Sequence, residues 1–152
     1  MGFRVTRSAQ ASWQGTVSEG AGRLALAGGA YEGPYSLRAR VEQVERTTNP
    51  EELIAAAEAG CFTMSLASLL EEEGHPARDV RTTAKVTLEQ TGSGFDITRI
   101  ELTTVAEVPG LEAGTFSRLA RSAKDCTVSR ALKGVDISLN ATLAPTESLA
   151  GA

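Results

Sequence analysis

A single long helix, expected from Pro50 to Glu73, constrains the fold of this chain more than any other segment. Residues 49–52 read Asn-Pro-Glu-Glu. Asparagine is a preferred N-cap, proline suits the first helical position, and acids favour the positive end of the helix dipole. The interior is almost entirely small or apolar, and Gly74 marks the end. A helix that is apolar on most faces is expected to be buried on most sides, here by a sheet and a second helix.

The remaining elements occur in groups of strands and groups of helices. Alternating patterns predict strands over residues 10–17, 23–27, 35–45, 80–90, 95–108 and 135–143. Two further helices are predicted, one over residues 112–124 and a short one after Cys126 that ends at Leu132. The turn at residues 91–94 predicts that the two longest strands form an antiparallel hairpin. This grouping predicts an α+β fold, with antiparallel sheets and a central buried helix.

Length and composition indicate an ordinary soluble protein. The chain has 152 residues, of which 41% are hydrophobic and 22% charged, so we expect one domain over residues 1–145 and a loose tail over 146–152. A net charge of −4 argues against nucleic acid as a partner, because phosphate binding needs a basic face. The start does not resemble a signal peptide, and no run is expected to reach the ~20 apolar residues of a membrane span. The expected location is the cytoplasm.

The chain has two cysteines, Cys61 inside the long helix and Cys126 at the start of a short one. In a reducing compartment such cysteines are free, catalytic or metal-binding more often than they form a structural disulfide. Together with the single His75 they are too few for a zinc site. We therefore expect no zinc site. A cysteine on an apolar helix is, however, often only a small hydrophobic residue.

A reactive Cys61 would need a cation nearby, because burial alone disfavours the thiolate that acts as nucleophile. Arg40, shortly before the helix, is the candidate, and Arg38 on the same face of the predicted strand is the alternative. An arginine buried beside a thiol would itself need an acid. Either Glu51 or Glu52 could provide it.

The spacing of Glu51 and Cys61 carries a further consequence. They are ten residues apart on one helix, which separates them by ~15 Å along its axis. Such a distance is too long for one small pocket within one subunit. If Glu51 supports the Cys61 site, it must come from a second copy of the chain, with two such helices packed antiparallel about a two-fold axis.

Cys126 is expected to reach its thiolate form, because backbone N–H groups at a helix start favour an anion. The two thiols could then form a redox cycle. Cys61 would attack a peroxide and become a sulfenic acid, Cys126 would condense with it to a disulfide, and an external thiol would restore both. Two other interpretations stay open from the residues: a dimeric module that binds an apolar ligand and has inert cysteines, and a small thiol-based sensor.

Several segments of this chain resemble the motifs of the OsmC/Ohr peroxidases, the family of osmotically inducible protein C and the organic hydroperoxide resistance proteins. The matching segments are residues 48–57 with 59–62, then Cys126 with Val128-Ser129 and Ala131-Leu132, Pro34-Tyr35 leading to Arg40, Val108-Pro109-Gly110 and Thr115-Phe116. The similarity extends from about Ser12 to Leu143. The Glu-Glu-Leu-Ile form and the Met-Ser-Leu run after Cys61 are closer to the OsmC branch.

The resemblance implies an intertwined α+β homodimer that reduces hydroperoxides, organic ones especially, at the expense of an external thiol and without a cofactor. By motif position, Cys61 would be the peroxidatic cysteine and Cys126 the resolving one. Arg40 would hold the thiolate and polarise the peroxide, and Glu51 would orient Arg40. The family places this arginine and glutamate on the subunit opposite the cysteines.

The chain departs from the family pattern at two positions. Many relatives have histidine where this chain has Glu58, three residues before Cys61, and proline where it has Thr127. The resemblance therefore assigns no role to Glu58. Threonine suits a first helical turn, so we expect Thr127 to change loop stiffness rather than chemistry.

Overall fold

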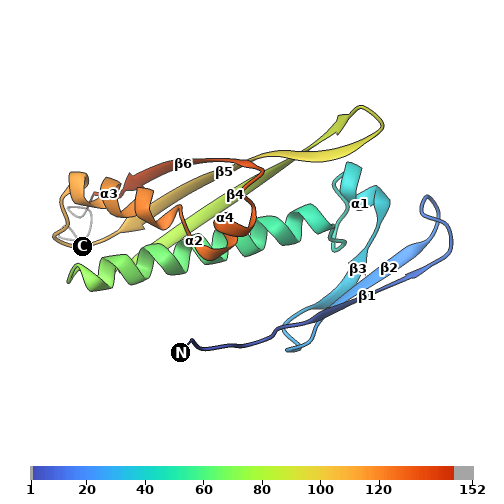
Figure 1. The fold of residues 1–152 in the computed structure, drawn as a ribbon, viewed down its shortest axis with the longest axis horizontal. Coiled ribbons are helices and arrows are strands. Elements are labelled where there is room, and N and C mark those ends of the chain that lie inside the picture. Colours follow the sequence, from blue (N-terminus) through green and yellow to red (C-terminus); the bar gives the residue numbers. More distant parts are fainter. Residues whose placement is uncertain (1, 146–152) are drawn as a thin grey trace. The chain divides into compact units, whose positions relative to one another are not determined.

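The computed structural model describes residues 2–145, which divide into two compact units between Leu53 and Ile54. Figure 1 shows the course of the chain through both. The tail predicted over residues 146–152 lies outside the described residues. The single domain expected over residues 1–145 stays a prediction.

The first unit contains a three-stranded antiparallel sheet in the order β1-β2-β3. Its strands are β1 (Ala9–Gln14), β2 (Ala21–Leu26) and β3 (Glu32–Tyr35); the first two lie within or near the predicted ranges 10–17 and 23–27, and β3 was not predicted. The rings of Trp13 and Tyr35 meet edge to face, with centroids 5.4 Å apart. They close over Gly22, where any side chain would collide with both rings. Glycine is thus required in the middle strand by close packing.

The strand predicted over residues 35–45 is wrong. The chain leaves β3 at Tyr35 and forms a short helix, α1 (Leu37–Val41), which carries Arg40. Ser36 caps it, because its hydroxyl accepts a hydrogen bond of 3.0 Å from the backbone N–H of Ala39. Capping and the local helical spacing outweigh the alternating pattern on which the strand prediction rested.

The second unit contains the predicted hairpin, β4 (Asp79–Thr91) and β5 (Gly94–Glu107), paired antiparallel. Two helices follow, α3 (Ala113–Ala123) and α4 (Thr127–Ala131), and both confirm the predictions made from the sequence. They return the chain so that β6 (Asp136–Leu143) runs parallel to β5. The predicted α+β class is confirmed, and among the strand pairs within residues 2–145 only β5–β6 is parallel. A parallel pair needs such a long connection, which α3 and α4 supply.

The long helix, α2 (Pro50–Glu72), begins and ends as predicted, and Gly74 just beyond it has a φ of +87°. Burial on most sides is not observed within this chain. A buried stripe at four-residue intervals faces the sheet, and Met64 on another face is 76% exposed. The stripe consists of Glu58, Phe62, Leu66 and Leu70.

The expectation that no segment reaches membrane-spanning length is also corrected. α2 has 23 residues and is long and apolar enough, by length and composition alone, to cross a membrane. The same helix packs its buried stripe into the core of the second unit. The core helices of water-soluble proteins can have the same length and the same apolar composition.

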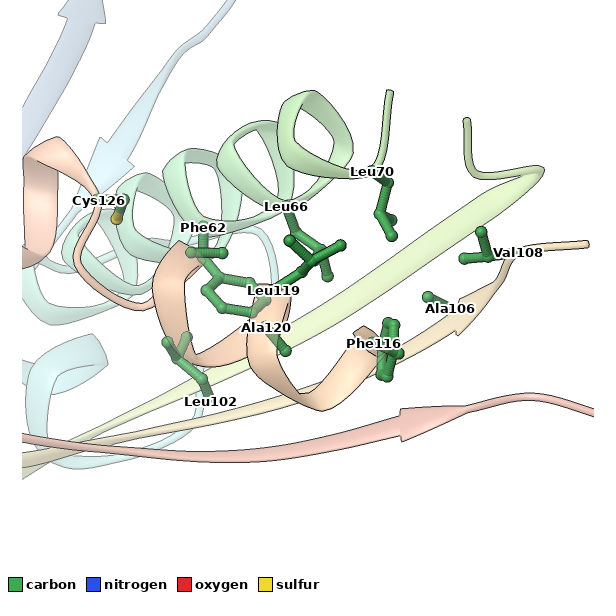
Figure 2. Packing of buried hydrophobic residues seen from close by; sticks show 11 residues of the cluster. Phe62, Leu66, Leu70, Leu102, Ala106, Val108, Phe116, Leu119, Ala120 and Cys126 are labelled. Carbon is green, nitrogen blue, oxygen red and sulfur yellow. The ribbon is translucent and has the colours of Figure 1, made fainter. Parts of the chain in front are cut away.

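The core of the second unit lies between α2, α3 and the β4–β6 sheet. Figure 2 shows Phe62 and Leu66 of α2 directed toward Leu119 and Ala120 of α3. One face of α3 is buried in this core; its members are Phe116, Leu119, Ala120 and Ala123.

A polar chain fastens α2 to the sheet beside this core. The hydroxyl of Thr63 donates to that of Thr82 at 2.8 Å, and the hydroxyls of Thr82 and Thr104 are 3.0 Å apart. Thr104 is fully buried and also donates to the carbonyl of Arg81. Each hydroxyl of this polar chain therefore has a partner. This polar chain fixes α2 against β4 and β5, close to the residues discussed next.

We predict that Phe116→Ala destabilises the fold by about 3–5 kcal/mol, because it leaves a cavity under α3. Phe116 is 1% exposed and lies in the core cluster. Denaturant unfolding measures the loss, with Ser117→Ala on the exposed face of α3 as control, expected within about 0.5 kcal/mol of wild type. A similar small effect for both variants would show that α3 does not close this core.

Candidate active site

The start of α2 is tied to α1 by one asparagine. The side-chain oxygen of Asn49 accepts from the backbone N–H of Glu52 at 2.8 Å, as an N-cap should. Its amide donates to the carbonyl of Ala39 at 2.9 Å. Thr48 donates its hydroxyl to the carboxylate of Glu52 at 2.8 Å, so Glu52 is engaged in the cap. The residues that start the helix therefore also fix α1, which carries Arg40.

Arg40 and Glu51 form a charge-assisted pair. Nε and Nη2 of Arg40 lie 2.7 and 2.6 Å from Oε1 of Glu51. The Glu51 side chain is 9% exposed and that of Arg40 35%. Arg38 instead pairs with Glu42 on the surface. Of the alternatives left by the sequence, the structure thus pairs Arg40 with Glu51.

The two cysteines lie together in the second unit. Cys61 is half-buried on α2, and Cys126 is the 4%-exposed N-cap residue of α4. Both are free thiols, and the Cys61 thiol is near enough to raise the pKa of the Cys126 thiol. The chain separates them by 65 positions, but both belong to the packing around one core, Cys126 as a buried member and Cys61 packed against it.

Glu58 is a third member of this cluster, and the sequence alone gave it no role. It precedes Cys61 by one helical turn and is fully buried. Its Oε1 accepts a hydrogen bond of 2.5 Å from the hydroxyl of Ser129 and one of 3.6 Å from the thiol of Cys126. The Cys126 sulfur and the Ser129 hydroxyl are 3.3 Å apart. An acid placed within the apolar stripe of α2 is the signal that could have pointed to it.

The expectation that Cys126 ionises easily is wrong. Burial raises the pKa of its thiol above the ordinary value, and the Cys61 thiol and the charge of Glu58 act in the same direction. Hydrogen bonds from Ser129 lower it but do not compensate. α4 has only five residues, and the dipole effect of a helix start is small beside desolvation.

Two free thiols in contact can interconvert with a disulfide, so this cluster has the composition of a dithiol redox centre. A family model described as OsmC-like protein matches residues 43–140. Peroxiredoxin OsmC of Escherichia coli (strain K12) is 40% identical over 131 residues, 85% of this chain and 91% of that protein. The chain belongs to the OsmC-like family, which confirms the family assignment made from its motifs.

Solved structures agree with this assignment. An organic hydroperoxide resistance protein OsmC from Legionella pneumophila has a TM-score of 0.67 at 24% identity, covering 91% of this chain and 99% of that one. The organic hydroperoxide resistance protein OhrB of Bacillus subtilis has a TM-score of 0.65 at 25% identity, covering 89% and 98%. The fold of this chain is the OsmC/Ohr fold.

We predict that Ser129→Ala raises the pKa of Cys126 further, because it removes a hydrogen bond that stabilises the thiolate. The ultraviolet absorbance of the thiolate reports this titration in a Cys61→Ser background, where a single thiol remains. Ser122→Ala, an exposed serine on α3, is the control and should leave the curve unchanged. An unchanged or lowered pKa in Ser129→Ala would contradict the arrangement of the cluster.

Proposed function

We propose that this protein reduces hydroperoxides, organic ones in particular, to alcohol and water through a two-cysteine cycle. Membership in the OsmC-like family and similarity to a peroxiredoxin support a cysteine-based peroxidase. The observation that carries the two-cysteine form is that Cys61 and Cys126, both free, pack at the same core and that the Cys61 thiol raises the pKa of Cys126. Cytoplasm, where thiols are kept reduced, is the proposed location.

In the first step, the Cys61 thiolate attacks one oxygen of the substrate and the O–O bond breaks. Cys61 becomes a sulfenic acid, and the alkoxide leaves and takes a proton to become the alcohol. Of the two cysteines, Cys61 is the more exposed, so it is the one that a substrate can reach.

In the second step, Cys126 attacks the Cys61 sulfur, a disulfide forms and water leaves. Two equivalents of an external thiol, or one dithiol, then reduce the disulfide and restore both cysteines. Little movement is required, because the two side chains already lie within reach of each other.

We further propose a homodimer in which the Arg40–Glu51 pair of one subunit serves Cys61 of the other. Glu51 and Cys61 lie ten positions apart along α2, about 15 Å in a regular helix. The ion pair is well formed, so Glu51 holds the partly exposed Arg40 guanidinium in a fixed orientation. Oε2 of Glu51 is buried and has no hydrogen-bond partner among residues 2–145, which suits an acceptor completed by a second chain.

We predict that Cys61→Ser abolishes peroxide turnover, whereas Cys126→Ser consumes one peroxide per site and then stalls. The reason is that Cys126 is needed only to resolve the sulfenic acid. Free thiols counted after one equivalent of cumene hydroperoxide test the cycle in wild type, which should lose both. Unchanged thiols would favour a module that binds an apolar ligand. Parallel rates with hydrogen peroxide, measured with a dithiol donor, define the preferred substrate.

Mixed dimers test the shared site. Glu51→Gln and Cys61→Ser homodimers should each be slow or inactive. The isolated heterodimer of the two variants should have about half the activity of the wild-type dimer, because one of its two sites is then intact. Mixed dimers that stay as inactive as their parents would show that Glu51 serves its own subunit.

A further inference from the structure

We propose that Glu58 is the proton acceptor for Cys126 when the disulfide forms, with Ser129 holding its carboxylate in place. This inference rests on the two-cysteine cycle proposed above and assigns its second step a base. It concerns residues 58, 126 and 129, which belong to one compact unit.

The geometry of the cluster supports this role. A general base must lie within hydrogen-bonding reach of the proton that it removes. Oε1 of Glu58 accepts a hydrogen bond of 3.6 Å from the Cys126 thiol, a normal length for a sulfur donor. The hydroxyl of Ser129 donates a hydrogen bond of 2.5 Å to the same oxygen. Ser129 lies in the first turn of α4, three residues after the N-cap residue Cys126, so α4 brings both donors to one carboxylate oxygen. The acid is therefore aimed at the reacting sulfur.

Packing alone does not explain an acid at this place. Glu58 is fully buried within the apolar stripe of α2, and its Oε2 has no hydrogen-bond partner among residues 2–145. Its described partners are a thiol and a hydroxyl, both neutral. A buried acid with only neutral partners costs stability relative to an apolar side chain. The oxygen without a partner among the described residues is Oε2, whereas Oε1 faces the Cys126 thiol and the Ser129 hydroxyl.

The chemistry of Cys126 creates the need for a base. Only the thiolate attacks sulfur, and burial raises the pKa of this thiol. At neutral pH the resolving cysteine is consequently protonated when Cys61 is oxidised. The neighbouring Glu58 carboxylate allows the protonated thiol to react, because it takes the proton as the S–S bond forms.

The proposed step balances as follows. The proton of the Cys126 thiol passes to the Glu58 carboxylate while its sulfur attacks the sulfur of the Cys61 sulfenic acid. The S–O bond of Cys61 breaks, and the departing hydroxide receives the proton held by Glu58 and leaves as water. Cys126 and Cys61 end as a disulfide, and Glu58 returns to the carboxylate.

A purely electrostatic role for Glu58 predicts the opposite effect of mutation. Its charge raises the pKa of Cys126, so Glu58→Gln removes repulsion and gives more thiolate. If charge were its only influence, disulfide formation would become faster in this variant. A proton acceptor predicts that it becomes slower, by about a hundredfold near neutral pH.

The experiment is a single turnover with one equivalent of cumene hydroperoxide and no reductant, quenched with acid and followed by intact mass. Glu58→Gln should oxidise Cys61 at close to the wild-type rate but accumulate its sulfenic acid. Raising the pH should restore its disulfide formation, as Cys126 ionises without help. The groups facing Cys126 that bear on this profile are Glu58 and Cys61 from α2 and Ser129 from α4.

Two further variants complete the test. Glu71→Gln, an exposed glutamate on the same helix, should behave as wild type. Glu58→Asp keeps the charge but retracts the carboxylate, so it should also slow disulfide formation, and it covers the case in which Glu58→Gln does not fold. Disulfide formation as fast as wild type in a folded Glu58→Gln or Glu58→Asp protein overturns the inference. Failure of wild type itself to oxidise Cys61 overturns the peroxidase proposal, and this inference with it.

Discussion

The structure of the second unit depends on the packing of one face of α2. Residues at four-residue intervals on this helix enter the core, and three of them, Phe62, Leu66 and Leu70, are fully buried. Glu58 continues the same stripe toward the helix start and is buried as completely. The helix that closes the core thus also carries the acid to the Cys126 thiol. Because core packing is dense and resists displacement, the cluster is held at fixed distances.

Burial gives the two cysteines different chemical tasks. Cys126 is almost completely enclosed, and the cost of removing a thiolate from water dominates its titration. Cys61 is more accessible on the same helix as Glu58. The more open thiol suits attack on a substrate, while the enclosed one suits a reaction with a sulfur already beside it. A buried thiol needs help to lose its proton, which links Glu58 to the resolving step.

Much of the architecture was predictable because local signals and tertiary packing agree. The Asn-Pro-Glu-Glu start of α2, the glycine turn of the β4–β5 hairpin and the stripe of α3 each favour one structure strongly. Residues 35–45 were mispredicted because their alternation fits a strand, whereas Ser36 caps a helix. The parallel direction of β6 depends on how α3 and α4 return the chain. No pattern within that strand specifies its neighbour.

The sequence alone determined the family, the identity of the two thiols and the helix on which Cys61 lies, since these follow from motifs and local propensities. It also named Arg40 and Glu51 through the family resemblance, although the chemistry of the residues by itself left Arg38 and Glu52 open. The tertiary structure showed that Arg40 pairs with Glu51, and only it joined Glu58 to Cys126 and Ser129, across 68 and 71 positions. The physical reason is that ionisation and proton transfer depend on burial and on distances of a few ångströms, which exist only after the helices have packed.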